Sequence, residues 1–145
     1  MSFAIDVNLL LYASDESSPF SPRARAFLGD CAAGHEILCV AWTTVMGYPR
    51  IATHPGIFAR PLAPNEAMRN IDALLRRPHV RVLAEEEGFW DVYRAVTRPL
   101  AVRGNLVPDA HLAAVLSQHG VRILYSSDND FRRFDFLEVR NPLGG

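Results

Sequence analysis

Short apolar segments alternate along this chain with longer segments whose apolar residues recur at helical spacing. The short segments are too brief for helices, and their composition indicates strands buried on both faces. They lie at residues 3–5, ending near Asp6, and at 37–42, 80–83 and 121–125, with a fifth expected at 137–139. Strands that alternate with helices predict a mainly parallel sheet of four to five strands, covered by helices in an α/β/α sandwich.

The expected helices begin at residues that favour helix starts and end at glycine or proline. One short helix is expected to be weak, because Gly47 and Pro49 both disfavour a helix interior. The loops are expected at 14–21 and 54–64. The helices are expected from Ser21-Pro22 to about Ala33, from Thr43 or Thr44 for a short distance, from Asn65 to Pro78, from Glu85-Glu86-Glu87 to Pro99, and from Val107 to Gln118.

Length and composition fit one globular domain that spans residues 1–145. The chain has 145 residues, and 49% of them are apolar, which suffices for a substantial core. Cys31 and Cys39 form neither a disulfide framework nor a zinc motif. No apolar run is long enough to span a bilayer, and the first residues lack the pattern of a signal peptide. We therefore expect a cytoplasmic protein without a membrane partner.

Four aspartates occupy positions at which ligands bind in parallel α/β sheets. Asp6 and Asp128 follow the first and fourth strands, Asp130 comes two residues later, and Asp109 falls in the first turn of a helix. The carboxyl ends of parallel strands share one edge of a sheet, so these side chains are expected to meet there. Clustered carboxylates attract a hard cation, and Mg²⁺ and Mn²⁺ both prefer oxygen ligands. The pattern predicts a divalent-metal site.

Each of these residues also has a simpler interpretation. Asp128 and Asp130 can form an Asx turn, and Asp109 can serve only as a partner of the helix dipole. Asn8 and Ser127 are candidates for hydrogen bonds to the metal ligands or for local turns.

Three arginines flank the acidic region in the sequence. Arg50, Arg132 and Arg133 can bind RNA phosphates through paired hydrogen bonds or can pair with surface carboxylates. The net charge of −1 argues against a generally basic nucleic-acid binder but leaves room for a local basic surface.

Four fragments in this order resemble the PIN-domain family, and in particular the VapC-type toxins of bacterial toxin–antitoxin pairs. They are FAIDVNLLLYA, YPRIATHPGIF, GNLVPDAHLAAVLSQHG and LYSSDNDFRRF. The resemblance implies a Mg²⁺-dependent endoribonuclease that forms a homodimer and is neutralised by a VapB-type antitoxin. By motif match, Asp6 takes the first acidic position, Asp109 the third and Asp128 the fourth, accompanied by Asp130.

The second acidic position departs from the family pattern. Matching through RIATHP places that position near Gly47, which can neither bind a metal nor accept a proton. This leaves open one metal ion or two, and it supports an alternative function as a catalytically weak PIN-like binding protein. Receiver domains and haloacid-dehalogenase-like phosphatases also gather aspartates, but they need a lysine. All 15 basic residues here are arginine, which argues against both classes.

Overall fold

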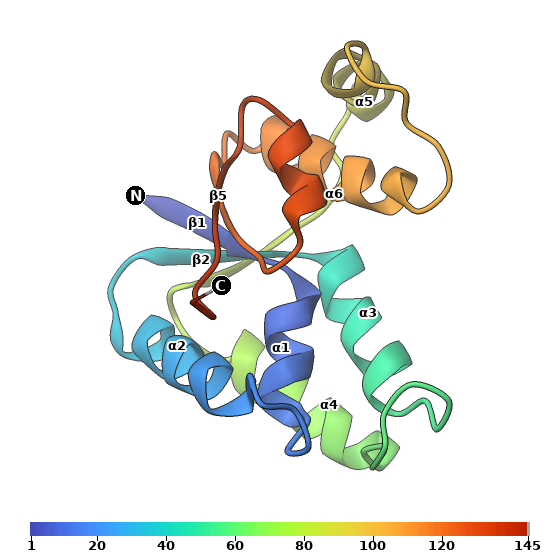
Figure 1. Cartoon of the computed structure of the whole chain (residues 1–145). Coiled ribbons are helices and arrows are strands. Elements are labelled where there is room, and N and C mark those ends of the chain that lie inside the picture. The colour runs from blue at the N-terminus through green and yellow to red at the C-terminus, as the bar shows by residue number, and fades with distance from the viewer. Residues whose placement is uncertain (145) are drawn as a thin grey trace.

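The computed structural model describes residues 1–144 and contains one five-stranded sheet in which all neighbouring strands run parallel. The order of the strands is β3-β2-β1-β4-β5, so the first strand lies in the centre (Figure 1). Their bounds are Ser2–Ile5 (β1), Ile37–Ala41 (β2), Val80–Leu83 (β3), Ile123–Tyr125 (β4) and Glu138–Arg140 (β5). The predicted parallel sheet is confirmed, including its fifth strand.

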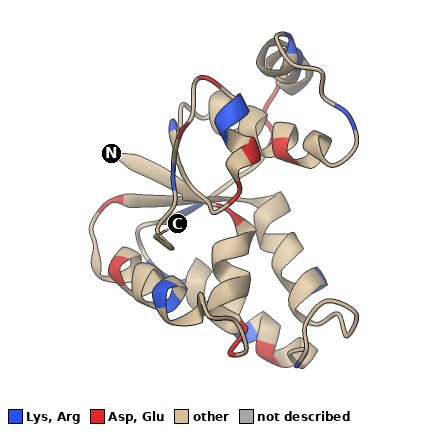
Figure 2. Cartoon of the chain, viewed as in Figure 1, with Lys and Arg blue, Asp and Glu red and all other residues tan. Residues whose placement is uncertain are grey.

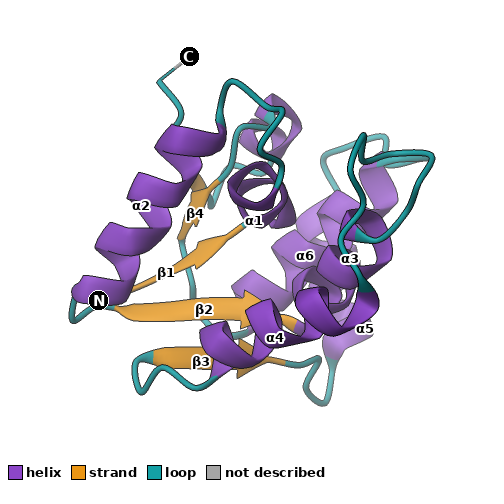
Figure 3. Cartoon of the chain, turned by 90° about the horizontal axis from the view of Figure 1, so that it is seen from below, coloured by secondary structure: helices purple, strands orange, loops and turns teal. Residues whose placement is uncertain are grey.

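Helices cover both faces of the sheet, which confirms the α/β/α sandwich (Figures 1 and 3). One face carries Val7–Ser14 (α1), Ser21–Ala33 (α2), Trp42–Ala52 (α3) and Pro64–Leu75 (α4). The other face carries Phe89–Thr97 (α5), Leu106–Gln118 (α6) and the 3-10 helix Asn129–Arg133 (η1). Within residues 1–144, no helix combines the length and the hydropathy that a membrane crossing requires.

The core has two halves because successive side chains of a strand point to opposite faces. Ile5 of β1 packs with Leu9 and Val40 on the face of α1 to α4. The adjacent Ala4 packs with Leu124 and Leu116 on the face of α5 and α6. Burial on both faces explains why these strands are apolar throughout rather than alternating.

Helix α1 is absent from the sequence prediction, which expects no helix before Ser21. The chain turns into α1 directly after β1, and the Asp6 carboxylate caps it by accepting a hydrogen bond from the Val7 N–H at 2.8 Å. Its three leucines, Leu9 to Leu11, are all buried. Three consecutive buried leucines hide the helical period, so the segment reads as a continuous apolar run.

Helix α3 is longer than the short helix predicted from the sequence. It spans 11 residues, begins after Ala41 rather than at a threonine cap, and contains Pro49 in its interior. Tyr48 is only 2% exposed, and its hydroxyl group contacts Ser14 Oγ at 2.6 Å and accepts a bond from Asn70 Nδ2 at 2.8 Å. Packing therefore overrides the low helix propensity of glycine and proline here.

Two predicted helix starts are also shifted. Glu85 to Glu87 lie before α5, which begins at Phe89. Gly88 precedes the helix and has a left-handed backbone conformation, with φ of 82°. Glu85 instead contacts the Nε2 atom of His111 on α6 at 2.6 Å. Asn65 lies inside the first turn of α4, where Ala63 is the capping position. Contacts of Glu85 and Glu86 with α6 hold the segment before α5 outside the helix, whereas α4 begins at Pro64, a residue that favours the first helical position.

Candidate metal centre

The predicted acidic residues lie at the edge of the sheet where β1 and β4 end. Asp6 directly follows β1, and Asp128 follows β4 and caps η1. Asp109 lies in the first turn of α6, and Asp130 lies on η1. Figure 2 shows acidic segments of α6 and η1 facing each other above the sheet. Elements far apart in the sequence thus deliver carboxylates to one place.

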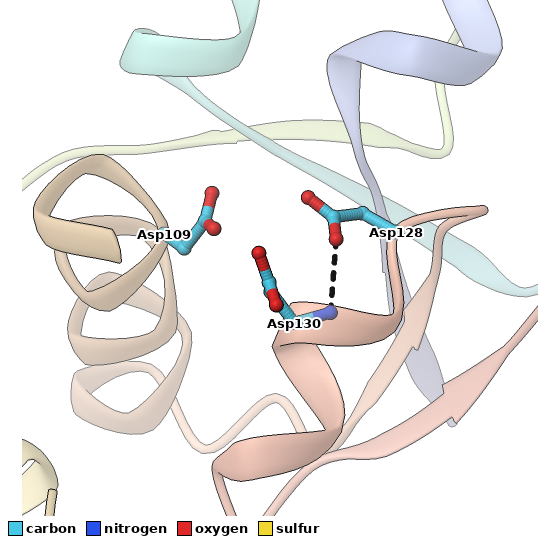
Figure 4. Close-up of side chains that lie close together, drawn as sticks. All are labelled: Asp109, Asp128 and Asp130. Atoms are coloured by element: carbon cyan, nitrogen blue, oxygen red, sulfur yellow. Dashed lines mark hydrogen bonds between the residues drawn. The ribbon is translucent and has the colours of Figure 1, made fainter. Parts of the chain in front are cut away.

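Three of these carboxylates form a close group. Asp109, Asp128 and Asp130 each place one carboxylate oxygen within 4.8 Å of the other two (Figure 4). The N–H of Asp130 donates to Asp128 Oδ1 at 2.9 Å. Asp128 therefore makes the Asx turn of the simpler interpretation and belongs to the acidic group as well.

Asp6 lies next to this group but outside it. Its side chain is only 7% exposed, and both of its oxygens accept hydrogen bonds. Oδ1 accepts from the Val7 N–H, and Oδ2 accepts from Ser126 Oγ, each at 2.8 Å. An ionised carboxylate has about four lone-pair sites, so Asp6 retains acceptor capacity after these two bonds.

Ser126 links two of the aspartates and was not identified from the sequence, which led to Ser127 instead. Its hydroxyl group donates to Asp6 and accepts from the Asp128 N–H at 2.9 Å, and the residue is 1% exposed. Ile5 pairs with Tyr125 across the β1–β4 ladder, so the next residues, Asp6 and Ser126, face each other. Only this register distinguishes the two serines.

The pKa values of Asp109 and Asp6 are both raised. Burial is the largest cause for Asp109, followed by the charges of Asp128, Asp6 and Asp130, and together they raise its pKa to about 6. Burial also raises the pKa of Asp6, against the lowering effect of the bonds from Ser126 and Val7. Such mutual repulsion favours either a bound proton or a bound cation.

The three predicted RNA-binding arginines do not lie together. Arg132 and Arg133 are exposed on η1, and Arg133 Nε lies 3.8 Å from Asp130 Oδ1. Arg132 Nε donates to Asn129 Oδ1 at 3.3 Å. Arg50 lies in the last turn of α3. It comes eight residues after the first residue of that helix, which corresponds to about 12 Å along the helix axis.

The remaining positions singled out in the sequence are Asn8, Ser127 and Gly47. Asn8 is half-buried on α1, and Ser127 is half-buried beside Ser126. Gly47 of α3 faces α1, and a Cβ atom added there would lie 3.6 Å from Val7 Cγ2, which is an ordinary contact. Position 47 therefore accommodates a Cβ atom close to the residue that follows Asp6.

The chemistry of the donor set fits a hard divalent cation. All members of the close group are carboxylates, two of them half-buried and one exposed. Mg²⁺ and Mn²⁺ take oxygen ligands and retain several waters, which suits a group that is open on one side. Thiolate and imidazole ligands, which favour zinc, are absent from this group among the described residues.

The raised pKa of Asp109 predicts a pH-dependent stability without metal. Between pH 4 and pH 6 the unfolded chain loses this proton before the folded chain does, so the free energy of unfolding should fall as the pH rises. Asp109→Asn should therefore gain stability relative to wild type over this interval. Urea unfolding in chelator at pH 4, 6 and 7.5 measures this gain. The exposed Asp72→Asn is the control, and a gain that is independent of pH would contradict the prediction.

Removal of the Ser126 hydroxyl group should destabilise the site. In Ser126→Ala, Asp6 Oδ2 and the Asp128 N–H each lose a buried partner, which costs about 1–3 kcal/mol per group. Ser127→Ala is the matched control and should change the free energy of unfolding by less than about 0.5 kcal/mol. Thermal and urea unfolding compare the two variants, and equal effects would argue against a bridging role for Ser126.

Comparison with known proteins places this geometry in a family. The family model described as the PIN domain matches residues 3–137. Ribonuclease VapC48 of Mycobacterium tuberculosis is 43% identical over 145 residues, covering 100% of both chains.

Two solved structures share the fold at low sequence identity. VapBC2 from Rickettsia felis, bound to a fragment of its promoter DNA, has a TM-score of 0.70 at 14% identity and covers 97% of this chain and 98% of that one. VapC20 of M. tuberculosis, a toxin that cleaves the sarcin–ricin loop, has a TM-score of 0.69 at 16% identity, with coverage of 95% and 98%. The family model and the full-length relative show that this chain belongs to the PIN-domain family, in its VapC group.

Proposed function

We propose that this chain is a metal-dependent endoribonuclease that hydrolyses RNA phosphodiester bonds, and that it is the toxin of a VapB–VapC type pair. The close group of Asp109, Asp128 and Asp130 carries this proposal, because three carboxylate oxygens within 4.8 Å of one another can hold a divalent cation. The name of the full-length relative, Ribonuclease VapC48, points to the same activity.

Mg²⁺ is the proposed cofactor, and Mn²⁺ is expected to substitute for it. Asp109, Asp128 and Asp130 would hold the ion, with a further oxygen from Asp6. A bound ion of this kind neutralises charge on a phosphodiester and lowers the pKa of a coordinated water. Ser126 contributes by fixing the orientation of Asp6 relative to the backbone of Asp128.

The arginines of η1 are the proposed contacts to the RNA backbone. Arg132 and Arg133 lie on the same short helix as Asp130, so a phosphate next to the acidic group is within their reach. Arg50 lies at the far end of α3 and would contact a more distant part of the strand.

The proposed protein partner is a VapB-type antitoxin, and both would act in the cytoplasm. The solved structure from Rickettsia felis is named VapBC2, which denotes such a pair. A basic side chain of the antitoxin would bind the acidic group in place of the metal. Its apolar residues would occupy a groove of about 940 Å³ between α1, α2 and α4, to which Leu28 contributes. Tyr48 also lines this groove, but at 2% exposure it is too deeply buried to serve as an apolar anchor.

A homodimer is part of the same proposal. Trp42 and Met46 are 47% and 61% exposed, respectively, and lie four residues apart on one side of α3. Exposed large apolar side chains of this kind are typical of protein interfaces.

Asp128→Asn is the direct test of the proposed activity. The amide oxygen can still accept the Asp130 N–H, so the turn should be preserved while the negative charge is lost. We expect cleavage of RNA in Mg²⁺ to fall by about 100-fold or more, because a catalytic ion contributes several kcal/mol. Gel assays with and without chelator measure this, and Asp72→Asn on α4 is the control.

The alternative function is that of a catalytically weak binding protein, and Gly47 is its basis. The wild-type chain would then leave RNA intact in Mg²⁺ or Mn²⁺ while still binding the antitoxin. Cleavage that survives both Asp128→Asn and chelator would contradict the metal-dependent mechanism and point to a contaminating nuclease.

Gly47→Glu tests whether this position belongs to the metal centre. A Cβ atom at position 47 makes only an ordinary contact with Val7, and the carboxylate of the glutamate would add an anionic oxygen to the group. We expect tighter Mn²⁺ binding in calorimetric titration. Gly47→Gln is the matched control, since it has the same shape without the charge, and equal affinities for the two variants would place position 47 outside the site.

A further inference from the structure

A second groove lies close to the acidic group, on the face of the sheet that carries α5 and α6. Its volume is about 550 Å³. It is bounded by α5, by the end of α6 and by the segment that follows η1. Ser117 of α6 lines this groove, and Asp109 lies eight residues earlier on the same helix, about 12 Å along its axis.

Arg133 connects the groove with the acidic group. Its side chain lines the groove, and its Nε atom lies 3.8 Å from Asp130 Oδ1. A strand whose phosphate binds the metal centre would therefore meet Arg133 next and could direct a neighbouring base into the groove. This continuity distinguishes the groove from the larger one between α1, α2 and α4, which is lined by none of the four aspartates of the acidic region.

The lining combines apolar side chains with two carboxylates. Val96 and Phe136 are half-buried and leave apolar surface open to the groove, whereas Phe134 is only 2% exposed and presents almost none. Asp91 and Asp135 are both exposed and also line the groove. Carboxylates accept hydrogen bonds and donate none, so they repel a phosphate and favour a group rich in donors.

We propose that this groove binds a guanine base of the RNA substrate, beside the bond that is cleaved. Single-stranded RNA is recognised by stacking of its bases and by hydrogen bonds to their edges. Guanine presents two neighbouring donors, N1–H and the N2 amino group, to a carboxylate, whereas the other bases present one donor group each. The apolar surface would contact the ring, Asp91 or Asp135 would accept from its edge, and Arg133 would bind the adjoining phosphate.

Nucleotide binding without metal tests this inference separately from the proposed activity on which it rests. The probes are the 5′-monophosphates of guanosine, adenosine, cytidine and uridine, titrated into the full chain in chelator and followed by amide NMR shifts. Guanosine monophosphate should bind at least about fivefold more tightly than the others, the lower end of what a bidentate base contact provides. Its shifts should map to α5 and Ser117.

Substitutions in the groove should remove this preference. Asp91→Asn and Asp135→Asn replace an acceptor by an amide, and Val96→Trp fills the space. Asp72→Asn is the control, because it is an exposed carboxylate on α4 away from the groove. In Mg²⁺, the wild type should cleave a random RNA pool with a preferred guanine next to the cut. The double variant Asp91→Asn and Asp135→Asn should lose that preference, whereas Asp72→Asn should keep it.

The outcomes separate the two proposals. If the wild type binds guanosine monophosphate but cleaves no RNA, the proposed nuclease activity is contradicted and the proposed guanine site is supported. If the wild type cleaves RNA but binds all four nucleotides equally, the proposed guanine site is contradicted. The same holds if the Asp91 and Asp135 variants keep the base preference of the wild type. A homodimer that protects α5 and Ser117 from solvent in hydrogen exchange would overturn it as well, because the base could not enter.

Discussion

The buried hydrogen bonds of Asp6 hold the functional edge of this sheet together. One carboxylate caps α1 through Val7 and binds Ser126, and Ser126 in turn binds the backbone of Asp128. The first strand, the first helix and the turn after β4 are therefore fixed by a single side chain that is 7% exposed. A neutral group of another shape could not accept from both sides, so the fold and the acidic site depend on the same residue.

The sequence predicts the parts of this site that follow from strand ends. Asp6 and Asp128 were identified because each follows an apolar strand, and Asp109 because it opens a helix. Ser126 was missed because its role depends on the pairing of Ile5 with Tyr125, which is a property of the assembled sheet. Helix α1 was missed for a different reason, because the consecutive buried leucines Leu9 to Leu11 hide its helical period although Asp6 is a favourable N-cap.

Local propensity and packing disagree most clearly in α3. Gly47 and Pro49 weaken the helix in isolation, yet the buried side chains of Val45, Tyr48 and Ala52 anchor it to the core. The hydroxyl group of Tyr48 adds contacts to α1 through Ser14 and to α4 through Asn70. Tertiary contacts of this kind cannot be read from the neighbouring residues, which is why the sequence predicted only a short helix here.

The electrostatic cost of the acidic group links folding to the binding of a cation. Burial and, after it, the neighbouring carboxylates raise the pKa of Asp109 to about 6, so near neutral pH the metal-free protein retains an electrostatic cost that the unfolded chain lacks. A ligand that binds only the folded state stabilises it in proportion to the logarithm of its concentration. A metal ion and a basic antitoxin side chain would relieve the same repulsion, so each should stabilise the fold and each should weaken binding of the other. Because Arg133 already lies beside Asp130, it provides part of this compensation within the chain itself.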